Sequence, residues 1–477
     1  MNRLGVLLWA VTLLIAGSAT ARLLGQKADA PHPRVDTLFS QFNNAASPGA
    51  AVVVVKDGRV VLKRAYGQAN LEYALPITST TPFHIGSVSK QFTAYAVLLL
   101  EQEGRLSLDD DVRKYIREVP DFRTPITLRH LLHHLSGLRD RESLLQMAGV
   151  TPADTFDTRQ ILRLLARQTA LNFKPGEQLE YCNTGYTLVA EVVARVAGKS
   201  FRAWTTEHVF RPLGMVHTWF ADDPVELVTQ AAYPYFKVGE RPEYVKGLLN
   251  HSMVGDTGVV TTAEDMVLWL RHLESPDPGH AALVGQLLGV SGTLNNGEKT
   301  GYGFGFGITS HRGMKVAVHS GMDAGFRASV TVFLEETLGI AILGNALSLK
   351  PLEQAYQIAD VILGLKPEPA ISEPAEAADE DRAAASIALD LTVIRSYQGR
   401  YFSEELETLY TVVEDGGKLL VKHWRNDDVI LSPLTKDTFT GDQSWIREMT
   451  FLRDAAGTIT AFQLDASRAR NLVFKKR

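Results

Sequence analysis

The sequence predicts an α+β domain followed by a small all-β domain. Two groups of strand-forming segments lie on either side of a long, mainly helical region, so one sheet should contain both ends of the first domain. After an acidic, proline-rich stretch, the chain continues in short alternating segments with glycine turns, which is typical of a small barrel or sandwich. A length of 477 residues exceeds one ordinary core and suits two or three domains.

The overall composition excludes two classes of partner. Hydrophobic residues make up 45% and charged residues 22% of the chain, as in a folded globular protein. A net charge of −5 gives no electrostatic basis for binding nucleic acid or an anionic membrane surface.

The first residues match a secretory signal peptide. Arg3 precedes an apolar run over residues 4–15, and residues 19–21 (ATA) form a cleavage site of small residues. We expect residues 1–21 to be removed and the mature chain to be secreted or periplasmic, with no membrane anchor after cleavage. Cys182 is the single cysteine of the chain, so we expect no internal disulfide.

The first domain should begin with a hairpin and a buried helix. Valine-rich residues 52–55 and 60–62 flank Asp57-Gly58, a strong signal for a two-residue turn. The stretch that starts at Ser87 is rich in small and aliphatic residues, which predicts a helix with little exposed surface. Gly104 supplies its end.

Helical periodicity dominates the middle of the chain. One segment breaks at Gly198 and Pro212, and another begins with Thr262 and Asp265 in the positions of a capping box. Successive antiparallel strands and a last helix then complete the domain. The expected helices cover residues 127–138, 157–170, 185–215, 261–274 and 351–365, and the expected strands cover residues 316–319, 328–334 and 339–343.

Composition also sets the expected domain boundaries. Residues 22–365 form the first domain. Residues 366–390 form an acidic linker rich in proline and alanine, because they contain few large apolar side chains. Residues 391–477 form the all-β domain.

Ser87 and Lys90 are the first candidate catalytic pair. Side chains three residues apart on a helix share a face, with Cβ atoms about 5–6 Å apart. A lysine in an apolar setting has a lowered pKa, and its neutral amine can accept the serine proton. Free backbone N–H groups at the start of the helix suit an oxyanion. The spacing alone is a weak signal, because Ser-x-x-Lys occurs in many unrelated chains.

Two further motifs strengthen this interpretation. In YCNTGY, the phenol of Tyr181 close to a cationic lysine can have a lowered pKa and act as a general base, and Asn183 can bind the lysine or a substrate carbonyl. In HSG, His319-Ser320-Gly321 stands at the end of an expected strand, where glycine allows a substrate to approach the backbone. The following N–H, on Met322, could join that of Ser87 as an oxyanion donor.

The order of these motifs is that of the serine β-lactamase and penicillin-binding-protein superfamily. The chain resembles its class C β-lactamase-like branch from about residue 35 to residue 365, through FHIGSVSKQFTA, ITLRHLLHHLSGL, YCNTGYTLVAEVV, YGFGFGI and HSGMDAGF. The resemblance implies a β-lactamase/transpeptidase-like fold, with an antiparallel sheet and a helical region. The tail resembles the lipocalin-like barrel that many members carry, and in some peptidase members such a domain reaches over the active site.

The resemblance also implies residue roles. Ser87 is the acylated nucleophile, Lys90 helps to deprotonate it, and Tyr181 is the base that activates serine and later water. The implied substrate-binding positions are Asn183, His319, Ser320 and Gly321, and the backbone N–H groups of Ser87 and Met322 form the oxyanion hole. His319 replaces a lysine that binds substrate carboxylates in true β-lactamases, and a mostly neutral histidine gives up that contact. The departure favours the esterase and peptidase-like members.

Other residues carry weaker signals. His130, His133 and His134 have a spacing that can hold a metal, but no acidic ligand completes the set and the family site needs no metal, so we expect structural roles. By the resemblance, residues 256–258 (DTG) line the pocket. We expect Cys182 to be a buried bystander.

We therefore expect an exported serine hydrolase that cleaves an ester or amide through a Ser87 acyl-enzyme, without cofactor or metal. The first alternative is a D-amino-acid peptidase, a carboxypeptidase or a weak β-lactamase. The second is a catalytically silent protein that binds a ligand in the same pocket. The expected partner is a small ester, amide or peptide, and the sequence gives no oligomeric state.

Overall fold

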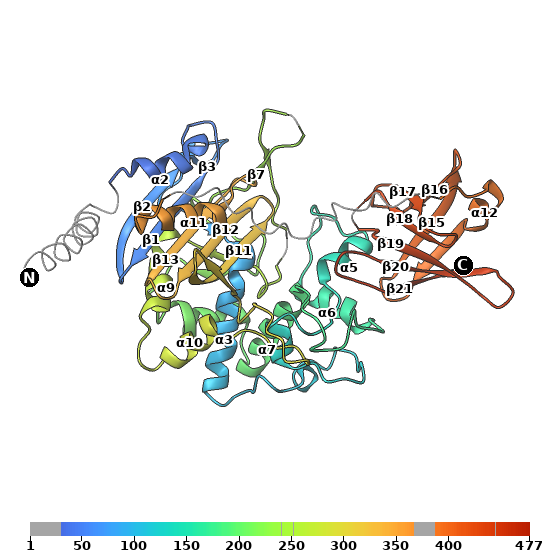
Figure 1. Ribbon diagram of the computed structural model, residues 1–477, viewed down its shortest axis with the longest axis horizontal. Coiled ribbons are helices and arrows are strands. Elements are labelled where there is room, and N and C mark those ends of the chain that lie inside the picture. Colours follow the sequence, from blue (N-terminus) through green and yellow to red (C-terminus); the bar gives the residue numbers. More distant parts are fainter. Residues whose placement is uncertain (1–29, 240, 251, 367–386, 444) are drawn as a thin grey trace, which may run out of the picture.

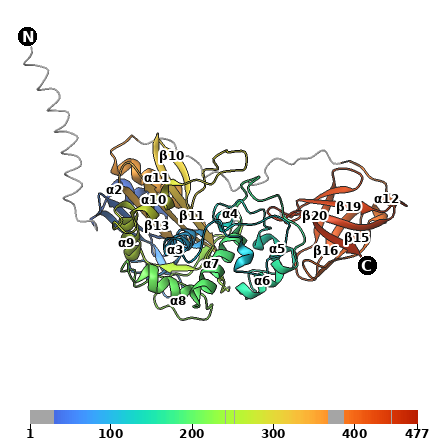
Figure 2. The same cartoon turned by 90° about the horizontal axis from the view of Figure 1, so that it is seen from below.

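The computed structural model describes residues 30–239, 241–250, 252–366, 387–443 and 445–477 (Figure 1). The expected signal peptide (residues 1–21) and most of the expected linker lie outside these residues, so both stay predictions. The larger domain contains a sheet with helices on both faces, and a separate barrel lies beside its helical region in both Figure 1 and Figure 2. No helix of the described residues is long and apolar enough to cross a membrane.

The main sheet joins the two ends of the first domain, as expected. Its strand order is β10-β11-β12-β13-β1-β2, and every neighbouring pair is antiparallel. The N-terminal hairpin therefore pairs with the C-terminal strands through β1 and β13. The strands are β1 Ala50–Lys56, β2 Arg59–Tyr66, β10 Gly307–His311, β11 Met314–Asp323, β12 Phe326–Phe333 and β13 Leu338–Gly344.

The apolar run of β1 is explained by burial on both sides of the sheet. Val53 and Val55 face a core shared with α3 (Lys90–Gln102) and α9 (Ala263–Glu274), whereas Val52 and Val54 face a second core under α11 (Pro351–Ile362). The turn after β1 has positive φ at both Asp57 (51°) and Gly58 (71°), the signature of the two-residue hairpin turn that the sequence predicted.

Two details of the predicted helices differ from the structure, and one is confirmed. Ser87 lies in a 3-10 turn, Gly86–Ser89, and α3 begins only at Lys90. Thr262 caps α9 by accepting from the Asp265 N–H (3.1 Å), but the Asp265 carboxylate accepts from His217 N–H instead of completing a capping box. The break at Gly198 is confirmed: it is the left-handed residue that ends α7.

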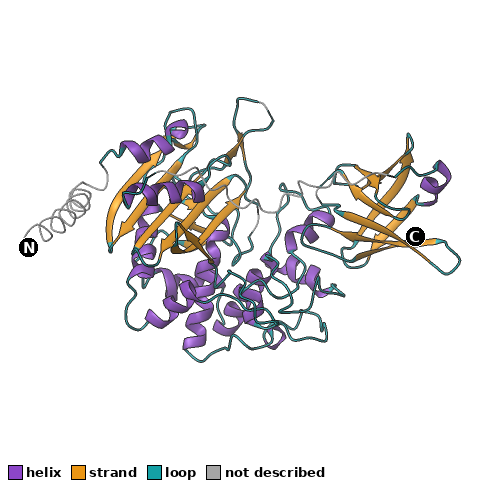
Figure 3. Ribbon diagram, viewed as in Figure 1, coloured by secondary structure: helices purple, strands orange, loops and turns teal. Residues whose placement is uncertain are grey.

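The remaining elements of the first domain are short. Its other helices are α2 Pro33–Leu38, α4 Leu128–Leu132, α5 Arg141–Met147, α6 Thr158–Ala166, α7 Asn183–Ala197, α8 Phe201–Thr205 and α10 Ala281–Gly289, and its minor strands are β3 Gln68–Asn70, β4 Leu75–Pro76, β5 Phe83–His84, β6 Trp219–Phe220, β7 Tyr235–Phe236, β8 Val245–Lys246 and β9 Val259–Thr261. Of these helices, α2 packs beside α11 on one face of the sheet, and the others lie on the opposite side, where α5 and α6 adjoin the barrel (Figure 3).

The second domain is a closed antiparallel barrel, because β14 pairs with both β15 and β21. Its core is continuous with apolar residues of α5 and α6, including Leu144, Met147 and Leu164. The barrel is thus packed onto the helices of the first domain rather than only tethered to them. Its elements are α12 Leu391–Ser396, β14 Gly399–Ser403, β15 Thr408–Asp415, β16 Lys418–Lys422, β17 Val429–Pro433, β18 Thr438–Gly441, β19 Glu448–Arg453, β20 Ile459–Asp465 and β21 Leu472–Lys476.

Candidate active site

The turn that carries Ser87 packs directly against strand β11. Gly86 has φ of 52°, and a Cβ at this position would lie 2.8 Å from the backbone nitrogen of Met322. A Cβ on Gly321 would lie only 2.1 Å from the carbonyl oxygen of Ile85. Gly321 is therefore required for the close approach of two protein backbones, and this contact, more than substrate access, explains the glycine. It brings the backbone N–H groups of Ser87 and Met322 into neighbouring segments.

Lys90 reaches Ser87 as its spacing predicted. In a 3-10 turn, side chains three residues apart lie almost above one another, and Lys90 Nζ is 3.1 Å from Ser87 Oγ. The same nitrogen donates to Asn183 Oδ1 (2.8 Å) and to the carbonyl oxygen of Asp256 (2.8 Å). Both of these oxygens can only accept. When Lys90 is neutral, its two N–H groups satisfy them and its lone pair faces the serine hydroxyl.

Burial makes the neutral form of Lys90 accessible near physiological pH, although the ammonium form still predominates at pH 7. The side chain is fully buried, and burial lowers its pKa from 10.5 to about 8, although Asp256 and Glu142 oppose this shift. The nitrogen also lies 4.8 Å from the ring centre of Tyr181. The expected lowering of the lysine pKa is therefore confirmed in direction.

Asn183, the first residue of α7, is held from two sides by the start of α5. Its backbone N–H donates to Asp140 Oδ2 (2.6 Å), and its Nδ2 donates to Glu142 Oε1 (2.9 Å). The amide orientation is thereby fixed, because Nδ2 has a carboxylate partner and only Oδ1 can accept from Lys90. The sequence motif identified Asn183 but not Asp140 and Glu142.

Tyr181 differs from its expected electrostatic state. Burial raises its pKa well above the ordinary value of 10, and the hydrogen-bonding Ser87 hydroxyl and the nearby Arg468 only partly oppose this. The prediction of a lowered tyrosine pKa is wrong in direction, because desolvation outweighs the neighbouring lysine. Tyr181 is a neutral phenol at any pH near 7, and as such it can donate a proton.

His319 lies inside β11 rather than at the end of a strand, since β11 continues to Asp323. Burial, with Lys90 adding to it, lowers the pKa of His319 to about 3, so the ring is neutral as expected. Nδ1 lies 2.6 Å from the carbonyl oxygen of Ser320 and must donate to it. Nε2 therefore accepts from the Tyr302 hydroxyl at 3.0 Å. Ser320 itself is exposed on the other face of the strand.

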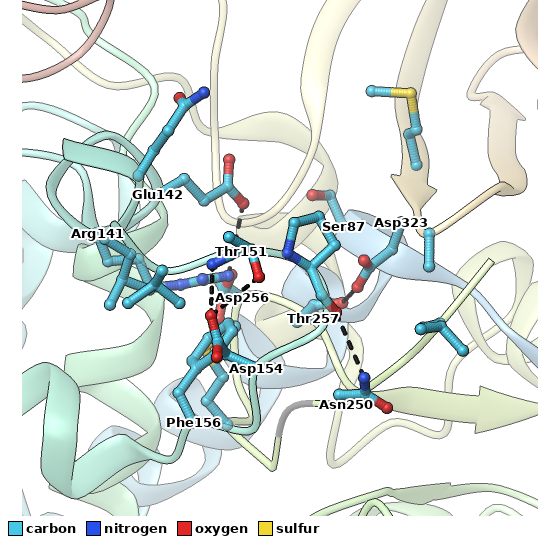
Figure 4. Close-up of a pocket in the computed structure, with 18 of the residues that line it drawn as sticks. Ser87, Arg141, Glu142, Thr151, Asp154, Phe156, Asn250, Asp256, Thr257 and Asp323 are labelled. Carbon is cyan, nitrogen blue, oxygen red and sulfur yellow. Dashed lines mark hydrogen bonds and ion pairs between the residues drawn. The ribbon is translucent and has the colours of Figure 1, made fainter. Parts of the chain in front are cut away.

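A cavity of about 440 Å³ opens beside Ser87. Figure 4 shows Arg141 and Glu142 of α5 on one side of it and Asp323 on the other, with Ser87 between them. Asp256 and Thr257 also line the cavity, as the resemblance implied. The apolar part of the lining comes from Leu145, Val150, Phe156, Leu248, Met253 and Met322.

The buried base of the cavity contains one tight ion pair. Arg141 donates to Asp256 Oδ2 at 2.5 Å, and Thr187 donates to Asp256 Oδ1 at 3.0 Å. Burial pushes the pKa of Asp256 up, but Arg141 and Lys90 outweigh it and lower the pKa. Asp256 thus stays ionised beneath the Lys90 amine.

The barrel contributes to the wall of the site. Asn426 lines the cavity, and its Nδ2 donates to the carbonyl oxygen of Gln146 at 2.8 Å. Next to it, Arg425 donates to Asp154 at 2.7 Å. On the inner side, Arg468 donates to Glu142 Oε2 at 2.7 Å. No local sequence pattern predicts these individual contacts, because each joins residues of two different domains.

The residues that carried weaker signals have other partners. The ring of His130 accepts from the Thr127 N–H at the start of α4, and that of His134 accepts from the Cys182 N–H. His133 Nδ1 lies 3.3 Å from the Tyr302 carbonyl oxygen. Cys182 is buried, and burial raises its pKa to about 12, as suits a bystander.

Comparisons with known proteins agree with this geometry. The family model described as "Beta-lactamase" matches residues 35–362. A D-aminopeptidase of Brucella anthropi is 30% identical over 326 residues, which cover 68% of this chain and 60% of the relative; matches to the curated relatives span about that share of their length. The octameric penicillin-binding protein homologue from Pyrococcus abyssi is 25% identical, with a TM-score of 0.60, and the match covers 90% of this chain and 96% of the other.

A further structural neighbour, SurE, covers 93% of this chain at a TM-score of 0.57 and 23% identity, which supports the fold alone. The predicted β-lactamase-like fold is thereby confirmed, together with the presence of a barrel, whose likeness to lipocalins stays a prediction. The family model spans more than half of the sequence, and the Ser-x-x-Lys, Tyr-x-Asn and His-x-Gly motifs meet around Lys90 and Tyr181, so the chain belongs to the Beta-lactamase family.

Proposed function

We propose that this protein is a serine hydrolase that cleaves an amide or ester through an acyl-enzyme on Ser87. The observation that carries the proposal is the set of contacts of Lys90 Nζ. Two of its three partners are obligate acceptors, so the lone pair of the neutral amine is directed at the Ser87 hydroxyl 3.1 Å away. A protein that only binds a ligand has no need of this arrangement of the four motif residues Ser87, Lys90, Tyr181 and Asn183.

In the proposed first step, Lys90 accepts the Ser87 proton while Oγ attacks the substrate carbonyl carbon. The carbonyl oxygen becomes an oxyanion, which the N–H groups of Ser87 and Met322 stabilise. The tetrahedral intermediate then collapses, the bond to the leaving group breaks, and the leaving nitrogen or oxygen takes up a proton. Tyr181, which is protonated, can donate that proton and be recharged from Lys90. Water, deprotonated by the same pair, releases the acid product and restores Ser87.

The proposed substrate carries a free amine rather than a carboxylate next to the scissile bond. The relatives named D-aminopeptidase support this choice. So does His319, which is neutral and has both ring nitrogens engaged, and which therefore offers no cation to a substrate carboxylate. Glu142, half exposed at the cavity, and Asp323 offer negative charge instead. A D-amino-acid amide is the first candidate and a simple ester the second.

We also propose that the protein is exported, with residues 1–21 removed. The support is the sequence pattern of Arg3, the apolar run and the small-residue cleavage site. N-terminal sequencing of the protein secreted by a bacterial host tests this: the expected first residue is Arg22, and an intact Met1 in the soluble fraction contradicts it.

Labelling with a fluorescent fluorophosphonate tests the proposed chemistry. Wild type should be labelled and Ser87→Ala should not, and Tyr181→Phe should react about 10²–10⁴ times more slowly, the usual contribution of a general acid–base group. Hydrolysis of D-alanine p-nitroanilide, its L enantiomer, its N-acetyl derivative, p-nitrophenyl butyrate and a chromogenic cephalosporin then ranks the substrate classes. Absence of labelling and of any turnover would favour the ligand-binding alternative.

A further inference from the structure

The segment between β20 and β21 of the barrel reaches the catalytic region of the other domain. The carbonyl oxygen of Arg468 accepts from the Asp140 N–H (2.9 Å) and from Asn172 Nδ2 (3.1 Å). Its guanidinium donates to Glu142 Oε2 at 2.7 Å, lies 3.5 Å from Asp140 Oδ1, and is 5.7 Å from the ring centre of Tyr181. Both the backbone and the side chain of Arg468 are therefore fixed by the first domain.

The partners of Arg468 are the two carboxylates that hold Asn183. Asp140 binds the backbone N–H of Asn183, and Glu142 binds its side-chain Nδ2. The other end of that amide accepts from Lys90. A continuous series of contacts thus leads from the barrel through Arg468, Glu142 and Asn183 to the amine beside Ser87.

We propose that Arg468 is a positioning residue for the Lys90 base, so that the barrel is a working part of the active site. Arg468 balances the charge of Asp140 and Glu142 and holds Glu142 against Asn183. The inference rests on the proposed function, because it concerns the same proton transfer. It adds a residue from the second domain, which the three family motifs do not contain.

Acidic, cationic and neutral titratable groups surround Lys90. The acidic ones are Asp140, which caps α5, Glu142 on α5, and Asp256 below. The cationic ones are Arg141 and Arg468, and the neutral ones are His134, His319, Tyr181 and Tyr186. Arg470, in the same barrel segment as Arg468, pairs with Glu180 of the first domain and contacts neither Asp140 nor Glu142.

The sign of the expected effect follows from these charges. Asp140 and Glu142 stabilise the ammonium form of Lys90 and oppose the lowering of its pKa by burial. Without Arg468, no arginine from the barrel offsets the negative charges of Asp140 and Glu142. The pKa of Lys90 then rises, and less neutral amine is present at pH 7. Removing the Glu142 charge has the opposite effect. The two changes combined should nearly cancel.

The experiment measures the rate of fluorophosphonate labelling of Ser87 against pH in the full-length chain, which requires no natural substrate. The acid limb of the profile is the range in which the rate rises with pH as Lys90 loses its proton. For Arg468→Met, we expect this limb to shift by about one unit to higher pH, which is an approximately tenfold loss of rate at pH 7. Arg468→Lys keeps the charge and should restore most of the rate. Glu142→Gln should move the limb down, and the double variant should return close to wild type.

Arg470→Met is the matched control, because it removes another inter-domain ion pair from the same segment. Its acid limb should coincide with that of wild type. The inference is overturned if folded Arg468→Met keeps the wild-type limb, or if Arg470→Met moves it equally. If Arg468→Met does not fold, Glu142→Gln decides, and a limb that is unmoved or raised overturns the inference. Wild type that is never labelled overturns the proposed function itself, which is a distinct outcome.

Discussion

Replacing Asn183 with aspartate tests the role of Lys90 through a change of almost no volume. Asn183 Oδ1 accepts from Lys90 Nζ at 2.8 Å, so the Asn183→Asp variant places a carboxylate in direct contact with the amine. The ammonium form of Lys90 is then stabilised. Because the neutral amine is the form that activates Ser87, the expected result is a slower reaction at neutral pH that recovers at high pH.

The size of the effect follows from the pKa of Lys90, about 8 in the wild type. At pH 7 about a tenth of the lysine is neutral. An opposite charge within about 4–6 Å shifts a titration by roughly 1–3 pH units. The Glu142 carboxylate lies 2.9 Å from the Asn183 nitrogen and repels the new charge, so we expect the lower half of this range. The rate at pH 7 should fall about ten- to hundredfold, and the acid limb should rise by about one to two pH units.

The assay is the labelling of Ser87 by a fluorophosphonate, followed from pH 6 to pH 10. Asn250→Asp is the control, because Asn250 lines the same cavity and its Nδ2 donates to the carbonyl oxygens of residues 152 and 153. It adds the same charge without touching Lys90, and its limb should stay near that of wild type. A profile of Asn183→Asp that falls by a constant factor at every pH would refute the reasoning, since it would show lost geometry without any change in the titration.

Three further outcomes can be measured directly. Glu405→Ala leaves the guanidinium of Arg139 buried without its 2.5 Å carboxylate partner at the domain contact, so thermal or urea unfolding should show a loss of about 3–5 kcal/mol, and a loss below 1 kcal/mol contradicts a buried pair. Gly321→Ala forces a Cβ against the carbonyl oxygen of Ile85, and Ser87-directed labelling should drop by at least about a hundredfold; unchanged labelling would show that the strand can move away. For a substrate with a free amine, a cation in the cavity should disfavour protonated Lys90, so the acid limb of kcat should lie below that of kcat/KM, and coincident limbs argue against that substrate class.

The sequence predicts the fold because its strongest signals are local. Asp57-Gly58 specifies a turn from two adjacent residues, and the apolar run of β1 specifies a strand buried on both faces. The pair Ser87 and Lys90 is also local, since a single turn brings both side chains together whether the turn is α-helical or 3-10. These features need no knowledge of the rest of the chain.

The parts that the sequence does not predict depend on distant contacts. The neighbouring lysine, taken alone, predicts a lowered pKa for Tyr181. The burial of the phenol by several segments of the chain instead raises its pKa. Glu142 and Arg468 are 326 positions apart and belong to different domains, and each has the sequence context of an ordinary exposed charge. Only the packing of the barrel against α5 makes them partners.

Charge balance explains why the barrel contact matters for chemistry and not only for stability. With Lys90 protonated, the cations Lys90, Arg141 and Arg468 match the anions Asp140, Glu142 and Asp256 one for one. Loss of the lysine proton therefore leaves the cluster one negative charge in excess. A substrate ammonium compensates that excess, while a substrate carboxylate adds to it. The site with neutral Lys90, which activates Ser87, is thus also the site that attracts a substrate amine. This link between activation and substrate choice depends on Arg468, because the arginine from the barrel balances one of the three carboxylates.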